Sequence, residues 1–371
     1  YTQILKKLYP DVPVILGGIE ASLRRLTHYD YWKERFAPSI LCDSGADMLI
    51  YGMGEKPVLE ISRRLLELCE TGNGPLSYNE EGEAQINVRT FREALQHQTA
   101  VPQTVSLFRK EDIPQGIQPD DIVLHSHEEC LKNPKKQSEN FRHIEEESNK
   151  YHACRIIQQT GDRFVVVNPP YPPMNQNELD HSFDLPYTRL PHPKYKGKHI
   201  PAYEMIKFSV NMHRGCFGGC AFCTISAHQG KFIMSRSKES ILKEVQAITE
   251  MEDFKGYLSD LGGPSANMYA MKGKNLSICE KCKKPSCIHP VICPNLNTDH
   301  TPLLEVYKAV DALPGIKKSF IGSGVRYDLL LHKSKDENIN QAAEKYTREL
   351  ITRHVSGRLK VCLLYTSPSP R

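Results

Sequence analysis

The sequence predicts an α/β protein of two domains, a doubly wound sheet followed by a barrel or an open α/β sheet. Apolar strands alternate with amphipathic helices in both halves of the chain, and such alternation is typical of parallel sheets covered by helices. A proline-rich segment separates the two halves. With 371 residues, the chain has the length of about two ordinary domains.

The amino-terminal domain is expected to span residues 1–167. Short apolar runs at 12–16 and 48–51 each end in glycines, as buried parallel strands do where they turn into helices. After the second run, Pro57 stands near the first turn of a segment with helical spacing of leucine, isoleucine and valine. We therefore predict a Rossmann-like, doubly wound sheet. Further strands are expected at 101–107 and 121–124, and a solvated helix at 132–150.

Residues 168–205 are predicted to be a linker, because seven prolines between 169 and 193 disfavour regular structure. The second domain follows at residues 206–361, and its strand–helix order predicts right-handed βα units. The expected elements, in order, are a strand at 206–212, a helix capped by Ser237, a strand at 256–259, a helix from Thr301 and a strand at 319–321.

Composition excludes two classes of protein. Hydrophobic residues make up 39% and charged residues 25%, which fits neither a membrane protein nor a disordered chain. No apolar run approaches the roughly 18 residues that span a bilayer, and no secretory signal is visible, so we expect a cytoplasmic protein without a membrane partner. The first residue is tyrosine and residues 362–371 read as a non-native tail, so we expect a chain truncated at both ends.

Three cysteines in one glycine-containing loop are the most informative feature. Cys216, Cys220 and Cys223 have the spacing C-x3-C-x2-C and follow directly after the predicted strand at 206–212. Thiolates bind iron–sulfur clusters, and three ligands on a four-iron cluster leave one iron open to an exogenous ligand. The alternative is a structural zinc site with a distant fourth ligand.

This loop resembles the signature of the radical S-adenosylmethionine (SAM) superfamily, with an aromatic residue, Phe222, before the last cysteine. The stretches RGCFGGC at 214–220 and SDLGGPS at 259–265 are similar to the YgiQ-type radical SAM family, over most of the chain. The resemblance implies a partial (β/α)6 radical SAM barrel, truncated here, that binds a [4Fe-4S] cluster and SAM. Reductive cleavage of SAM would yield a 5′-deoxyadenosyl radical, with an electron donor such as flavodoxin or ferredoxin.

The same resemblance assigns residues to the SAM site. Gly262 and Gly263 match two positions of the family's Gly-Gly-Glu motif, whereas Pro264 replaces the acid, so only the backbone role carries over. A second glycine-rich loop with Ser323, and Arg326 nearby, is a further candidate, although a tight turn would explain it equally well. The amino-terminal domain is similar to cobalamin-binding domains fused to some radical SAM enzymes, but cobalamin is not favoured.

A second group of four cysteines lies within the insertion 264–300: Cys279, Cys282, Cys287 and Cys293. Four thiolates complete a coordination shell, either around an auxiliary iron–sulfur cluster or around a zinc ion that folds the insertion. The spacing does not separate these alternatives.

Weaker signals concern the substrate. Nine basic side chains between 189 and 238, with interleaved tyrosines, could bind an RNA backbone or form a solvated face. His125, His127 and Glu128 are a further candidate for metal ligation. The substrate, a small molecule or RNA, is not specified by the sequence. The rival to a radical enzyme is a non-catalytic iron–sulfur or zinc-binding module that binds RNA.

Overall fold

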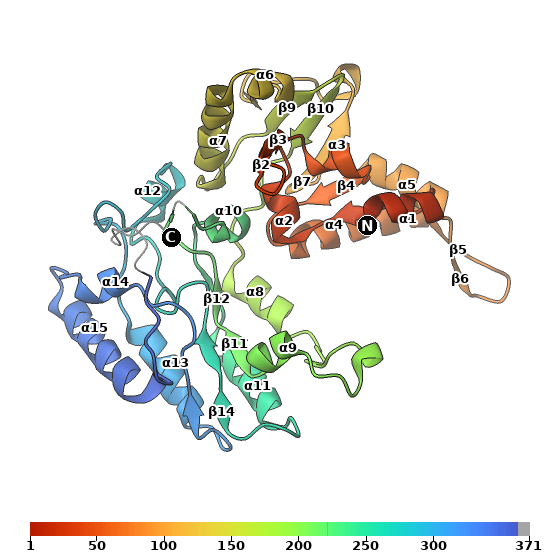
Figure 1. Ribbon diagram of the computed structural model, residues 1–371. Helices are drawn as coiled ribbons and strands as arrows, with labels where there is room; N and C mark the ends of the chain where they lie inside the picture. Colours follow the sequence, from red (N-terminus) through yellow and green to blue (C-terminus); the bar gives the residue numbers. More distant parts are fainter. Residues whose placement is uncertain (221, 363–371) are drawn as a thin grey trace. The chain divides into compact units, whose positions relative to one another are not determined.

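A computed structural model describes residues 1–220 and 222–362, which form two compact units (Figure 1). The first unit comprises Tyr1–Pro172 together with residues 227–229, and the second the rest of the described chain from Pro173. Among the described residues, no helix has the length and apolar character needed to cross a membrane.

A six-stranded sheet forms the centre of the first unit. Its strands, in spatial order, are β1 (Ile15–Leu16), β4 (Met48–Ile50), β7 (Thr104–Phe108), β10 (Arg163–Val167), β9 (Ile156–Thr160) and β8 (Ile122–Val123). The pairs β1–β4 and β8–β9 are parallel, while β4–β7, β7–β10 and β10–β9 are antiparallel. The sheet is therefore mixed: β7 runs antiparallel to both of its neighbours, and β9 and β10 form a hairpin whose turn contains Gly161 at a φ of 61°.

Helices cover both faces of this sheet, as expected for a doubly wound unit. Met48 and Ile50 face α4 (Glu55–Glu70) and α5 (Val88–Gln96), whereas Leu49 packs on the other side. The other helices are α1 (Thr2–Leu8), α2 (Gly18–Leu23), α3 (Ile40–Ser44), α6 (His127–Lys132) and α7 (Pro134–Ser148). Two hairpins, β2–β3 (His28–Asp30, Arg35–Ala37) and β5–β6 (Leu76–Tyr78, Ala84–Ile86), complete the unit with the short helix η1 (Lys110–Asp112).

The proline-rich segment is not an irregular linker, which corrects the prediction. It contains α8 (Gln176–Phe183), η2 (Pro193–Tyr195) and α9 (Pro201–Ile206). Asn175 and Glu178 form a capping box at the start of α8, and Pro201 takes the first helical position of α9. A proline that precedes a helix or occupies its first turn does not prevent the helix from forming. Helix α9 ends at Ile206, so this residue is not part of a strand as predicted.

The second unit contains a sector of parallel sheet. Strand β11 (Ser209–Asn211) pairs with β15 (Asp260–Gly262), and β14 (Tyr257–Leu258) pairs with β16 (Lys318–Ser319). Helices α11 (Lys238–Thr249), α13 (Thr301–Asp311) and α15 (Glu337–Glu349) follow the strands, and α15 continues into the π-helical turn η3 (Leu350–His354). The shorter elements are β12 (His213–Arg214), β13 (Met234–Ser235), α12 (Leu276–Glu280) and α14 (Tyr327–Leu331). Helix α10 (Ile225–Gln229) is divided, because its residues 227–229 belong to the first unit.

A shared core holds these helices on the sheet. Ile241, Val245 and Ile248 of α11 are fully buried, as their spacing predicts, and they join residues of β11, β14, β15 and α13 in one cluster. Ser237 accepts a hydrogen bond from the backbone of Ser240 and caps α11 as expected. The strand–helix repeat of a barrel is thus present, while closure into six units stays a prediction. Three loops continue from the carboxyl ends of these strands, and their described residues include 215–220, 263–266 and 322–326.

Candidate metal centre

The cysteine loop is held open by glycines at positions where a side chain would collide. A Cβ atom on Gly218 would lie 3.3 Å from Sγ of Cys216 and 3.6 Å from Sγ of Cys220. At Gly219, φ is 59° and a Cβ atom would lie 2.5 Å from the carbonyl oxygen of Pro285. The loop therefore leaves room beside two of its thiols, as a bound cluster requires.

The electrostatic surroundings fit an anionic metal–thiolate group. Burial raises the pKa of the Cys216 thiol to about 11, and it also raises the pKa of Cys220, so these groups carry protons at neutral pH unless a cation displaces them. The buried Arg326 places Nη1 3.6 Å from Sγ of Cys220 and also pairs with Asp328. Its positive charge opposes the effect of burial on Cys220.

Two predicted SAM-binding loops meet beside β15. The Asp260 carboxylate accepts hydrogen bonds from the backbone of Gly322 and Ser323, at 2.8 and 3.2 Å, and from Oγ of Ser323 at 2.6 Å. A Cβ atom on Gly262 would lie 2.7 Å from Oγ of Ser323. The structure thus brings together Gly262 and Ser323 across about sixty residues of sequence, and Asp260 fixes the second loop against the first.

His213 is a candidate site residue that the sequence analysis missed. A Cβ atom on Gly263 would lie 2.4 to 2.9 Å from three atoms of its ring, so the imidazole lies directly against this glycine. The side chain is fully buried, and within the described part of the chain neither ring nitrogen has a hydrogen-bond partner. Burial lowers its pKa to about 4, so it is neutral at pH 7. A buried neutral imidazole without partners fits a site completed by a polar ligand.

The other predicted site residues have different surroundings. Phe222 is 59% exposed. Cys223 follows Cys220 in a tight turn, its N–H donating to the Cys220 carbonyl at 3.0 Å. Cys362 was expected in a non-native tail, but a Cβ atom on Gly324 would lie only 2.7 Å from its Sγ. Cys362 is also among the groups that raise the pKa of Cys216. Residues 363–371 of that tail lie outside the described residues.

The second cysteine group also forms one cluster in space. The thiols of Cys279, Cys282 and Cys293 all raise the pKa of Cys287, which reaches about 11, with burial as the main cause. Nζ of Lys231, a side chain only 2% exposed, lies 3.8 Å from Sγ of Cys282 and donates to the carbonyl oxygen of Lys284 at 2.8 Å. A buried ammonium beside four thiols suits a negatively charged metal–thiolate group.

This second group is attached to the first loop through its backbone. The N–H of Cys287 donates to the carbonyl oxygen of Phe217 at 3.1 Å, and Oγ of Ser286 lies 3.4 Å from the same oxygen. Phe217 is 3% exposed and packs in one hydrophobic cluster with Ile288. The insertion therefore supports the loop that carries Cys216 and Cys220.

The weaker predicted sites do not come together. Nδ1 of His127 contacts Thr27, Nε2 of His125 contacts Glu139, and Glu128 accepts from the backbone of Gly161. The basic residues at 189–238 do not form one exposed stripe either, since Arg236 and Lys231 are buried. Neither histidines at alternate positions nor a run of basic residues determines that these side chains point the same way in the folded protein.

The fold and the cysteine loop together define a protein of the radical SAM class, and comparisons with known proteins support this conclusion. The family described as "Radical SAM N-terminal" matches residues 1–209. UPF0313 proteins of Bacteroides thetaiotaomicron and Porphyromonas gingivalis are 67% and 60% identical over 99% of this chain, covering 57% and 54% of their own lengths. The UPF0313 protein YgiQ of Escherichia coli is 39% identical over the whole chain and 52% of its own length.

The chain therefore belongs to the radical SAM family marked by this amino-terminal domain, among relatives of the UPF0313 or YgiQ type. It spans about half the length of the curated relatives that it matches.

Proposed function

We propose that this protein binds a [4Fe-4S] cluster through Cys216, Cys220 and Cys223 and cleaves SAM reductively. When bound, such a cluster supplies the electron that converts SAM to methionine and a 5′-deoxyadenosyl radical. The observation that carries the proposal is the cysteine loop itself, with a buried arginine beside one thiol, at the carboxyl end of a parallel sheet.

The residues around the loop have separate tasks in this proposal. Arg326 offsets the negative charge of the metal–thiolate group at Cys220. Gly262 and Gly263 expose backbone groups to the methionine part of SAM, and Asp260 keeps the Ser323 loop in position. His213, neutral at pH 7, has one N–H to donate and one lone pair to accept with. The buried side chains of His213 and Arg326 help to exclude water from the reacting atoms.

A second candidate function rests on Cys362. If this thiol completed a four-thiolate shell with the triad, no open iron would remain, and the unit would be a non-catalytic iron–sulfur or zinc module. Its charge acts on Cys216, as the charges of Cys220 and Cys223 do, which favours this alternative. The two candidates differ in what the substitution Cys362→Ala does: the enzyme keeps its SAM cleavage, whereas the closed module loses its metal.

The test uses the full-length protein, reconstituted with iron and sulfide without oxygen and reduced with dithionite. We expect SAM to be converted to 5′-deoxyadenosine, and Cys220→Ala to lower this conversion at least about a thousandfold, because a lost ligand removes the cluster. Cys154→Ala, at an isolated cysteine of the first unit, is the matched control and keeps wild-type activity. A protein that holds four iron atoms but never cleaves SAM contradicts the proposal.

The physiological partners follow from the same chemistry. A low-potential protein such as flavodoxin or ferredoxin would replace dithionite as electron donor in the cytoplasm, and a small molecule or RNA would donate the hydrogen atom. Deuterium transfer from a candidate substrate into 5′-deoxyadenosine identifies the substrate. Candidates that never transfer deuterium are excluded one by one.

A further inference from the structure

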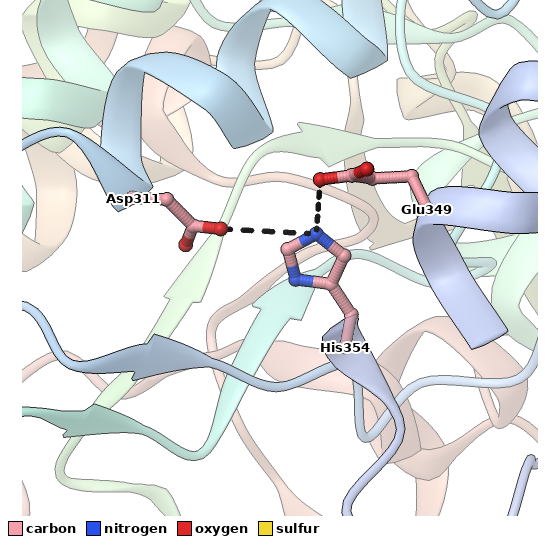
Figure 2. A group of neighbouring side chains, drawn as sticks. All are labelled: Asp311, Glu349 and His354. Carbon is pink, nitrogen blue, oxygen red and sulfur yellow. Dashed lines mark ion pairs between the residues drawn. The ribbon is translucent and has the colours of Figure 1, made fainter. Parts of the chain in front are cut away.

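Three ligand-type side chains meet at the far end of the second unit's strands. Asp311 ends α13, Glu349 ends α15, and His354 ends the π-helical turn that follows (Figure 2). Nε2 of His354 lies 4.0 Å from Oδ2 of Asp311 and 3.9 Å from Oε1 of Glu349. The three ligand atoms lie within 4.8 Å of one another.

The hydrogen bonds of His354 fix which nitrogen faces the carboxylates. Its side chain is 1% exposed, and Nδ1 lies 2.8 Å from the backbone carbonyl oxygen of Ser319, which can only accept. The proton of the neutral imidazole is therefore on Nδ1, and Nε2 presents a lone pair. Over the described ranges, Nε2 has no hydrogen-bond partner. A buried lone pair directed at two carboxylates is unfavourable unless something positive lies between them.

The helix ends favour a cation at this group. Asp311 is the last residue of α13, and His354 ends the helical run formed by α15 and its π-helical turn, so the negative ends of two helix dipoles lie here. Oγ of Ser319 donates to Oδ1 of Asp311 at 2.6 Å, which leaves Oδ2 for the histidine. The cation beside the group is Arg353, whose Nε lies 3.4 Å from Glu349 and whose side chain is 63% exposed. The ring of Tyr307 also lies beside the imidazole, with 4.7 Å between the ring centroids.

An unusual backbone conformation brings two of these residues together. A π-helical turn is rare and is frequent at functional sites, and here it aligns Glu349 and His354, five residues apart, on one side of the helix. Ser319 lies within β16, before the Ser323 loop that continues from this strand, whereas the cysteine loop follows the carboxyl ends of the strands. The group is therefore separate from the cluster site.

We propose that Asp311, Glu349 and His354 bind one divalent metal ion of the Mn²⁺ or Fe²⁺ type, which joins α13 to α15 at this end of the sheet. Two carboxylates and a neutral imidazole neutralise a charge of +2, and this donor set suits such ions better than thiophilic metals. Metal–ligand distances of about 2.0–2.2 Å require the ligand atoms to close to roughly 3.3 Å, a small movement for partly exposed carboxylates. The inference stands independently of SAM chemistry.

The test is a titration of the full-length, EDTA-treated protein with Mn²⁺, followed by electron paramagnetic resonance of the free and bound ion. We expect one tightly bound Mn²⁺ per chain, a nitrogen coupling from imidazole in the pulsed spectrum, and a higher unfolding midpoint. Asp311→Asn should weaken binding at least about tenfold. Glu344→Gln, an exposed acid on the same helix as Glu349, is the matched control and leaves binding unchanged.

Two results would overturn the proposal. In the first, the unsubstituted protein binds Mn²⁺ no more tightly than the double variant Glu349→Gln, His354→Gln. In the second, the ion binds but its spectrum shows no nitrogen coupling. In both cases the histidine would be the cation of the group, protonated between its carboxylates. Because the nitrogen coupling is measured on the unsubstituted protein, the test decides even if a variant fails to fold.

Discussion

Alanine at position 263 tests the contact between the Gly-Gly turn and the buried histidine. The new Cβ would lie 2.4 Å from Cε1 and 2.6 Å from Nδ1 of His213, against about 3.5 Å for an ordinary carbon contact. The ring would have to retreat by about 1 Å, and it is fully buried. Overpacking of this kind costs about 1–3 kcal/mol. The thiols of the triad are not touched.

The assay separates stability, metal content and turnover. We expect urea unfolding to show that loss for Gly263→Ala, iron content to stay at the wild-type value, and formation of 5′-deoxyadenosine to fall at least about tenfold, the equivalent of 1.4 kcal/mol. The control is Gly17→Ala, where a Cβ atom would have its nearest neighbour at 3.9 Å. Adding His213→Ala to Gly263→Ala removes the collision and should restore part of the stability.

The reasoning is refuted if Gly263→Ala cleaves SAM at the wild-type rate. It is also refuted if the double variant is no more stable than the sum of the two single changes in unfolding free energy predicts, because the loss would then not come from the collision.

Three further predictions concern charge and metal content. Burial lowers the pKa of His213 and His300 to about 4, below the ordinary 6.5. The free energy of unfolding should therefore be highest above pH 6.5 and should decrease as the pH falls from 6.5 to 4, by up to about 3 kcal/mol for each imidazole. Urea unfolding at a series of pH values measures this decrease, and a flat profile contradicts it. Arg326→Gln removes the charge that opposes the raised pKa of Cys220, so we expect iron content to fall at least about twofold, with Arg348→Gln, an exposed arginine, as the control. Metal analysis decides the second cysteine group: about eight irons per chain indicate two clusters, and about four irons with one zinc indicate a zinc site. In either case Cys287→Ala should also reduce iron at the triad, because an insertion that loses its metal would no longer hold in place the backbone N–H of residue 287, which donates to the Phe217 carbonyl of that loop.

The parts of the site predicted from sequence are those encoded locally. The spacing of Cys216, Cys220 and Cys223 within one loop predicts a metal centre without any knowledge of the fold, and the alternation of strands and helices predicts the α/β class. His213 could not be found in this way, because its environment is created by Gly263, fifty residues later, and no spacing rule links the two.

The same limit applies to elements that depend on long-range contacts. The mixed order of the first sheet arises because β7 pairs antiparallel with β4 and β10, strands that lie far from it in sequence, and no local pattern predicts such pairings. Asp311, Glu349 and His354 come from two helices, and nothing in their spacing marks them as neighbours. Cys362 looked like part of a tail because its flanking residues form no pattern, yet its N–H bonds to the carbonyl oxygen of Val325 at 2.9 Å.

The bond between the insertion and the cysteine loop has a consequence for how the protein matures. Because the carbonyl oxygen of Phe217 is held by Cys287, a polypeptide whose insertion has not yet acquired its metal would present the triad on an unsupported loop. Delivery of metal to the insertion would then have to come first. Oxidation of the insertion thiols in air would then weaken the support of the neighbouring triad loop without changing Cys216, Cys220 or Cys223.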